Sequence, residues 1–207
     1  MSAKLRGVNT KELLGLCSLV LGSVGYVPYI KQMLRRQTMP HAYSWLTWAV
    51  LATVAFGVQA GGKGGPGAWL QALTAVATFS IFLLSLRYGH KDIQLADKIS
   101  LFFAGVAFVL WLFTNQPLAA AILISIIEAA GGFFPTFRKS YNQPYEETAI
   151  SYLTYATSVP FSIAALENYS AANIVYPVAV LFLNASAFVF LMVRRYQVSR
   201  LPKRAVL

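Results

Sequence analysis

Ser125-Ile-Ile-Glu128-Ala-Ala-Gly-Gly132-Phe-Phe-Pro135 lies inside an apolar run that extends from Leu118 to Phe137. An α-helix needs about 20 such residues to cross the hydrocarbon core of a bilayer. Glu128 stands near the middle of the run, where an ionisable side chain is costly and by default marks a substrate, ion or proton pathway. The stretch therefore predicts a membrane-spanning helix with a functional carboxyl group at mid-depth.

The composition of the whole chain indicates an all-α integral membrane protein. Of its 207 residues, 57% are hydrophobic and only 12% are charged, whereas a soluble domain carries about 25% charged residues. The formal net charge of +10 is attributed to loops on the cytoplasmic side, so no nucleic-acid partner is expected. The single cysteine, Cys17, excludes an internal disulfide and a multi-cysteine metal site, and no metal or cofactor is expected.

Seven apolar runs are candidate membrane spans. They cover Leu13–Ile30, Ala42–Ala60, Ala68–Leu86, Ile99–Phe113, Leu118–Phe137, Ala149–Leu166 and Ile174–Val193. An odd number of spans puts the termini on opposite sides, with 4 basic residues on the N-terminal side and 13 on the other. The positive-inside rule then predicts a multi-pass cell-membrane protein whose N-terminus is outside and whose C-terminus is cytoplasmic.

The chain repeats itself at an offset of 107 residues. Gly25 matches Gly132 and Pro28 matches Pro135, while Leu21 occupies the position of Glu128. Further matched pairs are Ser44 with Ser151, Trp45 with Tyr152, Trp48 with Tyr155, Tyr26 with Phe133, Trp69 with Tyr176 and Arg87 with Arg194. We interpret this as a duplication.

The offset predicts seven transmembrane helices arranged as two parallel three-helix repeats joined by a linker helix (3+1+3). Residues 1–97 would form the first repeat, 98–115 the linker helix and 116–196 the second repeat. Residues 197–207 would form a basic cytoplasmic tail that lies against anionic lipid headgroups.

Each repeat carries a proline close to the predicted cytoplasmic end of its first helix. Pro28 follows Gly25, and Pro135 follows Gly132. Proline removes a backbone hydrogen bond and bends a helix, so these four residues are candidate hinges of an inner gate. A static kink or simple helix termination is the alternative interpretation.

These features resemble the SWEET sugar transporters and, more broadly, the PQ-loop superfamily. The chain reads Pro28-Tyr29 and Pro135-Thr136 where that superfamily has Pro-Gln, and Glu147 stands at the position equivalent to Pro40. The resemblance implies a solute transporter with a central site. It also implies a substrate-binding role for Asn184, in the middle of the seventh span; its counterpart is Ala77, which Thr78 follows. An interhelical hydrogen bond is the alternative role for Asn184.

Aromatic and polar residues complete the set of candidate site residues. Trp45 and Trp48, like Tyr152 and Tyr155, are three residues apart, so each pair shares a helix face. They could stack on a ring or a cation, although their position near helix ends favours an interfacial aromatic belt.

Ser125 shares a helix face with Glu128. Glu128 could hold and release a proton near neutral pH or bind a cationic substrate. The alternative interpretation is a protonated carboxyl group that makes a hydrogen bond to a neighbouring helix.

The sequence thus predicts a non-enzymatic transporter of a small polar solute that is sugar-like, amino-acid-like or cationic. Transport would proceed by alternating access, with proton coupling through Glu128 as an option. A receptor or assembly protein of the same architecture is the alternative, and a homo-oligomer is left open. An enzyme is disfavoured because the spans hold one carboxylate and no histidine. The glycine-rich loop Gly61–Gly67 is expected to be a flexible external turn.

Overall fold

The structure is a computed structural model that describes residues 9–36, 40, 42–89, 95–145 and 147–200. Within these residues the chain is all-helical and has no strand. The α-helices are α1 (Thr10–Leu34), α2 (Ala42–Gly61), α3 (Trp69–Tyr88), α4 (Leu95–Phe113), α5 (Pro117–Ile127), α6 (Phe134–Asn142), α7 (Ala149–Ala164) and α8 (Ala171–Ser199). A 3-10 turn, η1 (Gly65–Ala68), precedes α3, and a π-helical turn, η2 (Glu128–Phe133), joins α5 to α6.

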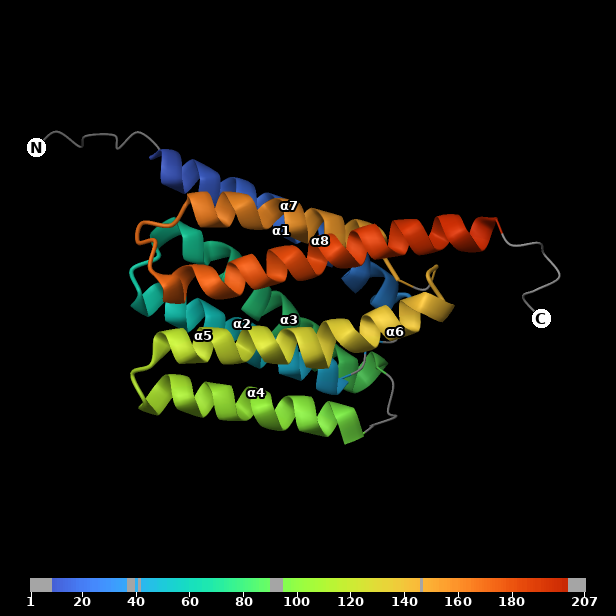
Figure 1. Cartoon of the computed structure of the whole chain (residues 1–207), viewed down its shortest axis with the longest axis horizontal. Coiled ribbons are helices and arrows are strands. Elements are labelled where there is room, and N and C mark those ends of the chain that lie inside the picture. The colour runs from blue at the N-terminus through green and yellow to red at the C-terminus, as the bar shows by residue number, and fades with distance from the viewer. Residues whose placement is uncertain (1–8, 37–39, 41, 90–94, 146, 201–207) are drawn as a thin grey trace, which may run out of the picture.

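Because α5, η2 and α6 are continuous, the described residues form seven helices that lie side by side (Figure 1). Five of them are long and apolar enough to cross a membrane: α1, α2, α3 with η1, the α5–α6 rod and α8. Helix α4, which begins at Leu95 instead of the predicted Ile99, and α7, with 16 residues, are shorter. The coarse prediction of a multi-pass helical membrane protein is thereby confirmed.

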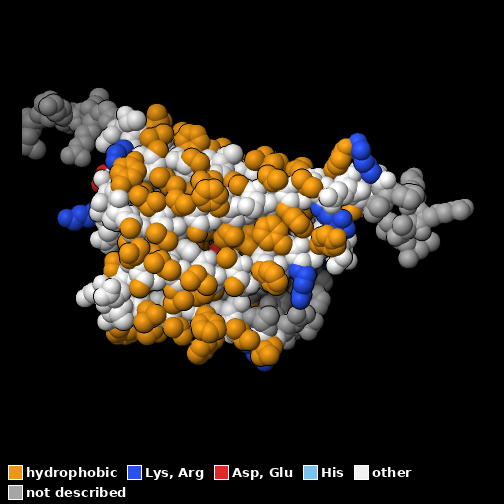
Figure 2. Space-filling model, viewed as in Figure 1, with side chains coloured by type: hydrophobic (Ala, Val, Ile, Leu, Met, Phe, Trp, Pro, Cys, Tyr) orange, Lys and Arg blue, Asp and Glu red, His pale blue; other side chains and the backbone are white. Residues whose placement is uncertain are grey.

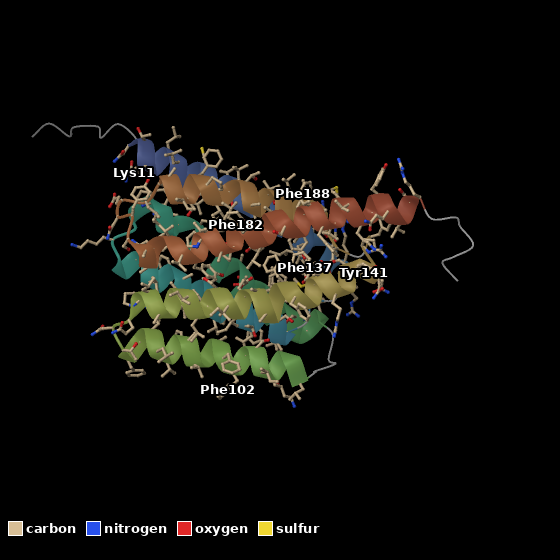
Figure 3. The ribbon with its side chains drawn as sticks, in the orientation of Figure 1. Lys11, Phe102, Phe137, Tyr141, Phe182 and Phe188 are labelled. Atoms are coloured by element: carbon tan, nitrogen blue, oxygen red, sulfur yellow. The ribbon has the colours of Figure 1, made fainter. Side chains whose placement is uncertain are left out.

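The surface agrees with this conclusion. Apolar side chains cover the flank of the bundle in Figure 2, and the visible lysine and arginine side chains lie towards its two ends. Many large apolar residues on this surface are exposed, including Val20, Phe102 and Phe182. Phe102 lies on the outer side of α4, away from the other helices (Figure 3). Lipid tails are the natural surroundings for such a surface, since contiguous apolar patches of this extent are rare on soluble monomers.

The helices pack in two groups of three. Helix α3 lies between α1 and α2, and α8 lies between α5 and α7. In the described residues the backbones of α1 and α2 are not adjacent, and neither are those of α5 and α7. Long side chains still bridge α1 and α2, as Tyr29 and Trp45 do. Across the groups, α1 packs along α7 just as α5 packs on α2, while α4 covers α2 and α5. Helices α1 and α5 run in the same direction, and α1 begins at the end of the bundle opposite to the one at which α8 finishes (Figure 1).

Local signals fix the start of the helices. Asn9 caps α1 by accepting a hydrogen bond from the Lys11 N–H, and the Glu12 carboxylate accepts one from the Asn9 N–H at 3.0 Å. This reciprocal pair is a capping box. Ser170 caps α8 by accepting the Asn173 N–H. At its other end α1 continues through Pro28 to Leu34 without a break, so Pro28 does not terminate the helix.

The glycine-rich loop is packed tightly against the segment between α7 and α8. A Cβ atom on Gly67 would lie 2.8 Å from the Leu166 Cα and 2.6 Å from its Cδ2. Gly61, at the start of the same loop, has no atom within 4 Å of the equivalent position. The two glycines therefore form a matched pair for mutation.

We expect Gly67→Ala to lower the midpoint of thermal unfolding in detergent by several degrees. Overpacking of this kind costs about 1–3 kcal/mol, because the Leu166 backbone cannot rotate away as a side chain could. Gly61→Ala is the control and should leave the midpoint unchanged or slightly raised. Equal midpoints for both variants would contradict the tight contact.

Candidate functional site

A cavity of about 690 Å³ lies between the two groups of helices. It reaches from mid-bundle, at Glu128 and Thr74, to Pro40 and Tyr145, which lie in the segments joining α1 to α2 and α6 to α7. We call the end at which it opens the basic end, because α1, α3, α6 and α8 finish there with Arg35, Arg87, Arg138 and Arg200 on or just beyond their last turns. Helices α1, α2, α3, α5 to α6, α7 and α8 all line the cavity, whereas α4 contributes nothing to it.

Residues related by the 107-residue offset face one another across this cavity. The matched pairs on its wall are Tyr26 with Phe133, Ser44 with Ser151, Trp45 with Tyr152, and Trp48 with Tyr155. Helices α2 and α7, which carry three of these pairs, do not contact each other in the described residues. The space between them is therefore bounded on both sides by equivalent positions of the two halves.

Glu128 is the carboxyl group at mid-depth. Its side chain is 8% exposed and lines the cavity. The Tyr176 hydroxyl donates a long hydrogen bond of 3.5 Å to its Oε2. No lysine, arginine or histidine is found among the described residues that line the cavity. The described lining therefore offers Glu128 no basic side chain.

A π-helical turn places Glu128 at the end of α5. The Phe134 N–H donates to the Ala129 carbonyl, five residues back. Pro135 follows immediately and has no N–H to continue an α-helical ladder. A wider turn is one way to adapt the backbone in front of a proline, and such turns are common at functional sites. The predicted bend at Pro135 thus takes the form of a π turn, while Pro28 lies within a regular α-helix.

The polar groups of α3 and α8 present oxygen atoms to the cavity. The Thr74 hydroxyl donates to the Leu70 carbonyl at 2.8 Å, and the Thr78 hydroxyl donates to the Thr74 carbonyl at 2.7 Å. Asn184, 9% exposed, donates from Nδ2 to the Val180 carbonyl at 2.8 Å. The Thr74 hydroxyl also lies 3.3 Å from the Tyr155 hydroxyl. The oxygen atoms of Thr78 and Asn184 are acceptors that a ligand could use.

The aromatic residues belong to the cavity wall and not to an interfacial belt, which corrects the preferred sequence interpretation. The Trp45 ring lies 4.9 Å from the Tyr29 ring and 5.1 Å from the Trp48 ring, centroid to centroid. Trp45 Nε1–H donates to the Tyr29 hydroxyl at 3.2 Å. On the opposite wall the Tyr152 hydroxyl donates to Glu147 Oε2 at 3.0 Å. Hydrogen bonds thus hold rings on both walls in fixed orientations.

Other predicted site residues lie beside the cavity or outside it. Ser125 does not line it, and its hydroxyl donates to the Ala121 carbonyl of the same helix at 2.7 Å. Gly25 lines the cavity, while a Cβ on Gly132 would meet Trp48 Nε1 at 2.9 Å, so Gly132 makes room for that ring. Pro28 is absent from the described lining. The side chain of Pro135 lies outside the described residues.

Sequence reasoning missed Tyr29, Thr74, Glu147 and Tyr176 as lining residues. It also matched Tyr26 to Phe133 without assigning either to the site. The offset offered a signal for some of them: Tyr29 is matched by Thr136, which also lines the cavity. Tyr176 could be placed only once α8 was known to pack on α5.

The other end of the cavity is closed by hydrogen bonds between the two halves. The Gly62 carbonyl accepts from Asn168 Nδ2 at 2.9 Å and from Asn173 Nδ2 at 3.0 Å. The Gly64 carbonyl accepts from the Glu167 N–H at 3.0 Å, and the Gly67 carbonyl accepts from the Ser162 hydroxyl at 2.7 Å. We call these contacts the latch.

The latch is reinforced from α1 and α2. Lys11, which lies at this end of the bundle in Figure 3, donates from Nζ to the Leu166 carbonyl. Gln59 Nε2 donates to the Asn173 carbonyl at 3.0 Å. Gly65 adopts a φ of +61°, a left-handed conformation that favours glycine. The Gly61–Gly67 loop is therefore tied to the α7–α8 segment, and the expectation of a flexible free turn is corrected.

Comparison with protein-family models, with curated proteins and with solved structures finds no match to this chain. The resemblance to SWEET and PQ-loop proteins therefore stays a prediction from the sequence.

The shape of the cavity predicts one-sided access. In a Cys17→Ala background, Ser151→Cys should react with a membrane-impermeant thiol reagent added at the basic end, because Ser151 lines the open cavity. Ser162→Cys, buried at the latch, is the control and should react from neither side. The measurement is labelling in sealed vesicles, with sidedness read from cleavage of a C-terminal tag. Labelling of Ser151→Cys only from the opposite side would contradict the structure.

Proposed function

We propose that the chain is a membrane transporter of a small polar solute. The observation that carries the proposal is a cavity whose two walls come from equivalent residues of the two halves. It opens at one end of the bundle and is closed at the other by hydrogen bonds between the halves. Transporters built from repeats bind substrate near the bilayer midplane at the repeat interface, where both halves can rock around the site.

The two moving units of this proposal are α1–α3 and α5–α8, joined by α4. In the division expected from the sequence, residues 1–97 form the first unit, 98–115 the linker and 116–196 the second unit. The shared packing order, in which the third helix separates the first two, supports a 3+1+3 arrangement. So does the common direction of α1 and α5 in Figure 1, since parallel repeats need an odd number of spans between equivalents.

The basic end is the cytoplasmic side in this proposal, following the positive-inside rule. The N-terminus is then external, and the structure corresponds to a state open to the cytoplasm with the latch closed outside. Membrane embedding rests on the apolar helices; the cell membrane and the direction of the termini belong to the proposal. The proposal also keeps the SWEET and PQ-loop resemblance, with Asn184 and Thr78 as substrate-binding groups.

Glu128 is assigned the coupling role. A carboxyl group inside a membrane protein is retained at an energetic cost, and it typically serves a proton relay or a bound cation. The one hydrogen bond that Glu128 accepts in the described structure is long, and a hydroxyl group supplies it. When no solute is bound, a proton would neutralise the buried carboxylate at lower cost than leaving it charged.

The test is solute flux in proteoliposomes that contain the wild-type protein or Glu128→Gln. A panel of sugars, amino acids, amines and vitamins is offered while internal pH and labelled solute are followed. The proposal expects one solute to accumulate with a proton signal that Glu128→Gln abolishes. Glu12→Gln removes an exposed carboxylate at the other end of the bundle and should keep wild-type flux, because glutamine also serves at this position of a capping box. Absence of flux across the panel with folded protein would contradict transport and favour a receptor or assembly role.

The first repeat suggests a second variant. Leu21 is the residue of the first repeat that matches Glu128. The substitution Glu128→Leu therefore gives the second repeat the same apolar residue as the first. We expect flux to be lost while the midpoint of thermal unfolding is unchanged or raised, since functional sites commonly sacrifice stability and a buried carboxyl group costs free energy. A lowered midpoint would show that Glu128 holds the bundle together and would contradict its role as a coupling group.

A further inference from the structure

The mid-depth part of the wall presents hydrogen-bond acceptors. The Thr74 and Thr78 hydroxyls donate to carbonyl groups of their own helix, and Asn184 Nδ2 donates to the Val180 carbonyl. Two carboxyl groups, Glu128 and Glu147, also line the cavity. A ligand that satisfies these acceptors donates hydrogen bonds to them, because buried polar groups without partners are costly.

The ionisable side chains that line the cavity are acidic and not basic in the described residues. Its described lining holds two glutamates and no lysine, arginine or histidine. Arg195 lies near the opening, but its Nε and Nη2 donate to the Pro144 and Glu147 carbonyls at 3.0 and 2.6 Å, and it is not part of the lining. A phosphate, an organic acid or the carboxylate of an amino acid would find no basic partner among these residues. A cation would be favoured near Glu128, where water is scarce and electrostatic interactions are strong.

Aromatic rings make up much of the remaining wall. They come from six segments of the bundle: Tyr26, Tyr29, Trp45, Trp48, Phe133, Tyr145, Tyr152, Tyr155 and Tyr176. Trp48 and Tyr155 are repeat equivalents on α2 and α7, on either side of the cavity. Ring faces attract cations and also pack against flat apolar groups. Both properties point to a ligand that combines a positive charge with a ring.

We propose that this cavity binds a small organic cation, a protonated primary amine carried on a flat ring and lacking a carboxylate. The ammonium group would donate to Glu128 and to the oxygens of Thr74, Thr78 or Asn184, and the ring would pack among the aromatic side chains that include Trp48 and Tyr155. The assignment rests on the proposed function of the same site and narrows its substrate class from polar solutes in general. It disfavours sugars and amino acids as the principal ligands.

Three probes with the same phenylethyl body isolate the charge: phenethylamine, 2-phenylethanol and 3-phenylpropanoate. Binding is measured by isothermal titration calorimetry on the full chain in nanodiscs, with heats from empty nanodiscs subtracted. The amine is expected to bind at least tenfold more tightly than the neutral alcohol, and the acid is expected not to bind. Equal affinity for amine and alcohol, or tighter binding of the acid, would overturn the inference without any variant having to fold.

Matched variants locate the site. Glu128→Gln and Trp48→Leu should each weaken phenethylamine binding at least tenfold. Glu12→Gln and Trp111→Leu should leave binding unchanged, because neither residue lines the cavity. Weakening by the control variants alone would overturn the assignment.

The flux assay separates the two proposals. Amine binding without flux in the wild type would refute transport and leave the ligand class standing. Flux of a neutral sugar, together with no binding preference for the amine, would refute the ligand class and leave transport standing.

Discussion

Hydrogen bonds to the backbone carbonyls of Gly62, Gly64 and Gly67 hold the two halves of the bundle together at one end. These carbonyls follow the end of α2, where helical carbonyl groups run out of partners within the helix. Side chains and an N–H group from the α7–α8 segment satisfy them. The glycines allow the close approach, since a Cβ at Gly67 would strike the Leu166 backbone. With this end closed, the cavity between the halves is open only towards the basic end in the described structure.

The helices of the two halves pack in the same order, but the two halves differ in the ionisable group at mid-depth. Matched aromatic residues line the cavity from both halves, whereas the mid-depth carboxyl group of Glu128, in η2, has Leu21 at the matching position of α1. The backbones differ at the same place, because the second half has a π turn before its proline and the first half has a regular helix. The matched positions thus account for much of the cavity wall, and the departure from symmetry places the carboxyl group at mid-depth. This division fits a site in which a symmetric scaffold carries one specialised group.

Much of the fold was predictable because a bilayer imposes simple rules on sequence. Apolar runs located the helices to within a few residues, and the 107-residue offset identified pairs that lie on opposite walls of the cavity. The depth of Trp45 and Trp48 was not predictable, since a position near a helix end is compatible with a lipid belt and with a cavity. Only the packing of α3, α4 and α5 on α2, which leaves another side of α2 facing the cavity, decides which direction those rings face.

Two further misses have definite physical causes. The span Leu118–Phe137 was predicted as a regular α-helix with 100° per residue, and the π turn that begins at Glu128 changes the direction of every side chain after it. The latch could not be predicted from the sequence, because its acceptors are backbone carbonyl groups of glycines. Glycine has no side chain that would indicate such a contact. A glycine-rich sequence predicts conformational freedom, yet here the same small residues permit close packing.

The central claim is that the two halves move relative to each other around one cavity. Spin labels on Lys63→Cys with Tyr169→Cys at the latch, and on Arg35→Cys with Asn142→Cys at the basic end, would report each end separately in a Cys17→Ala protein. Distance distributions from pulsed electron paramagnetic resonance, measured in lipid with and without saturating transported solute, are the direct test. The account predicts that a longer distance appears at the latch as a shorter one appears at the basic end. A single unchanged distribution at both ends under all conditions would contradict it.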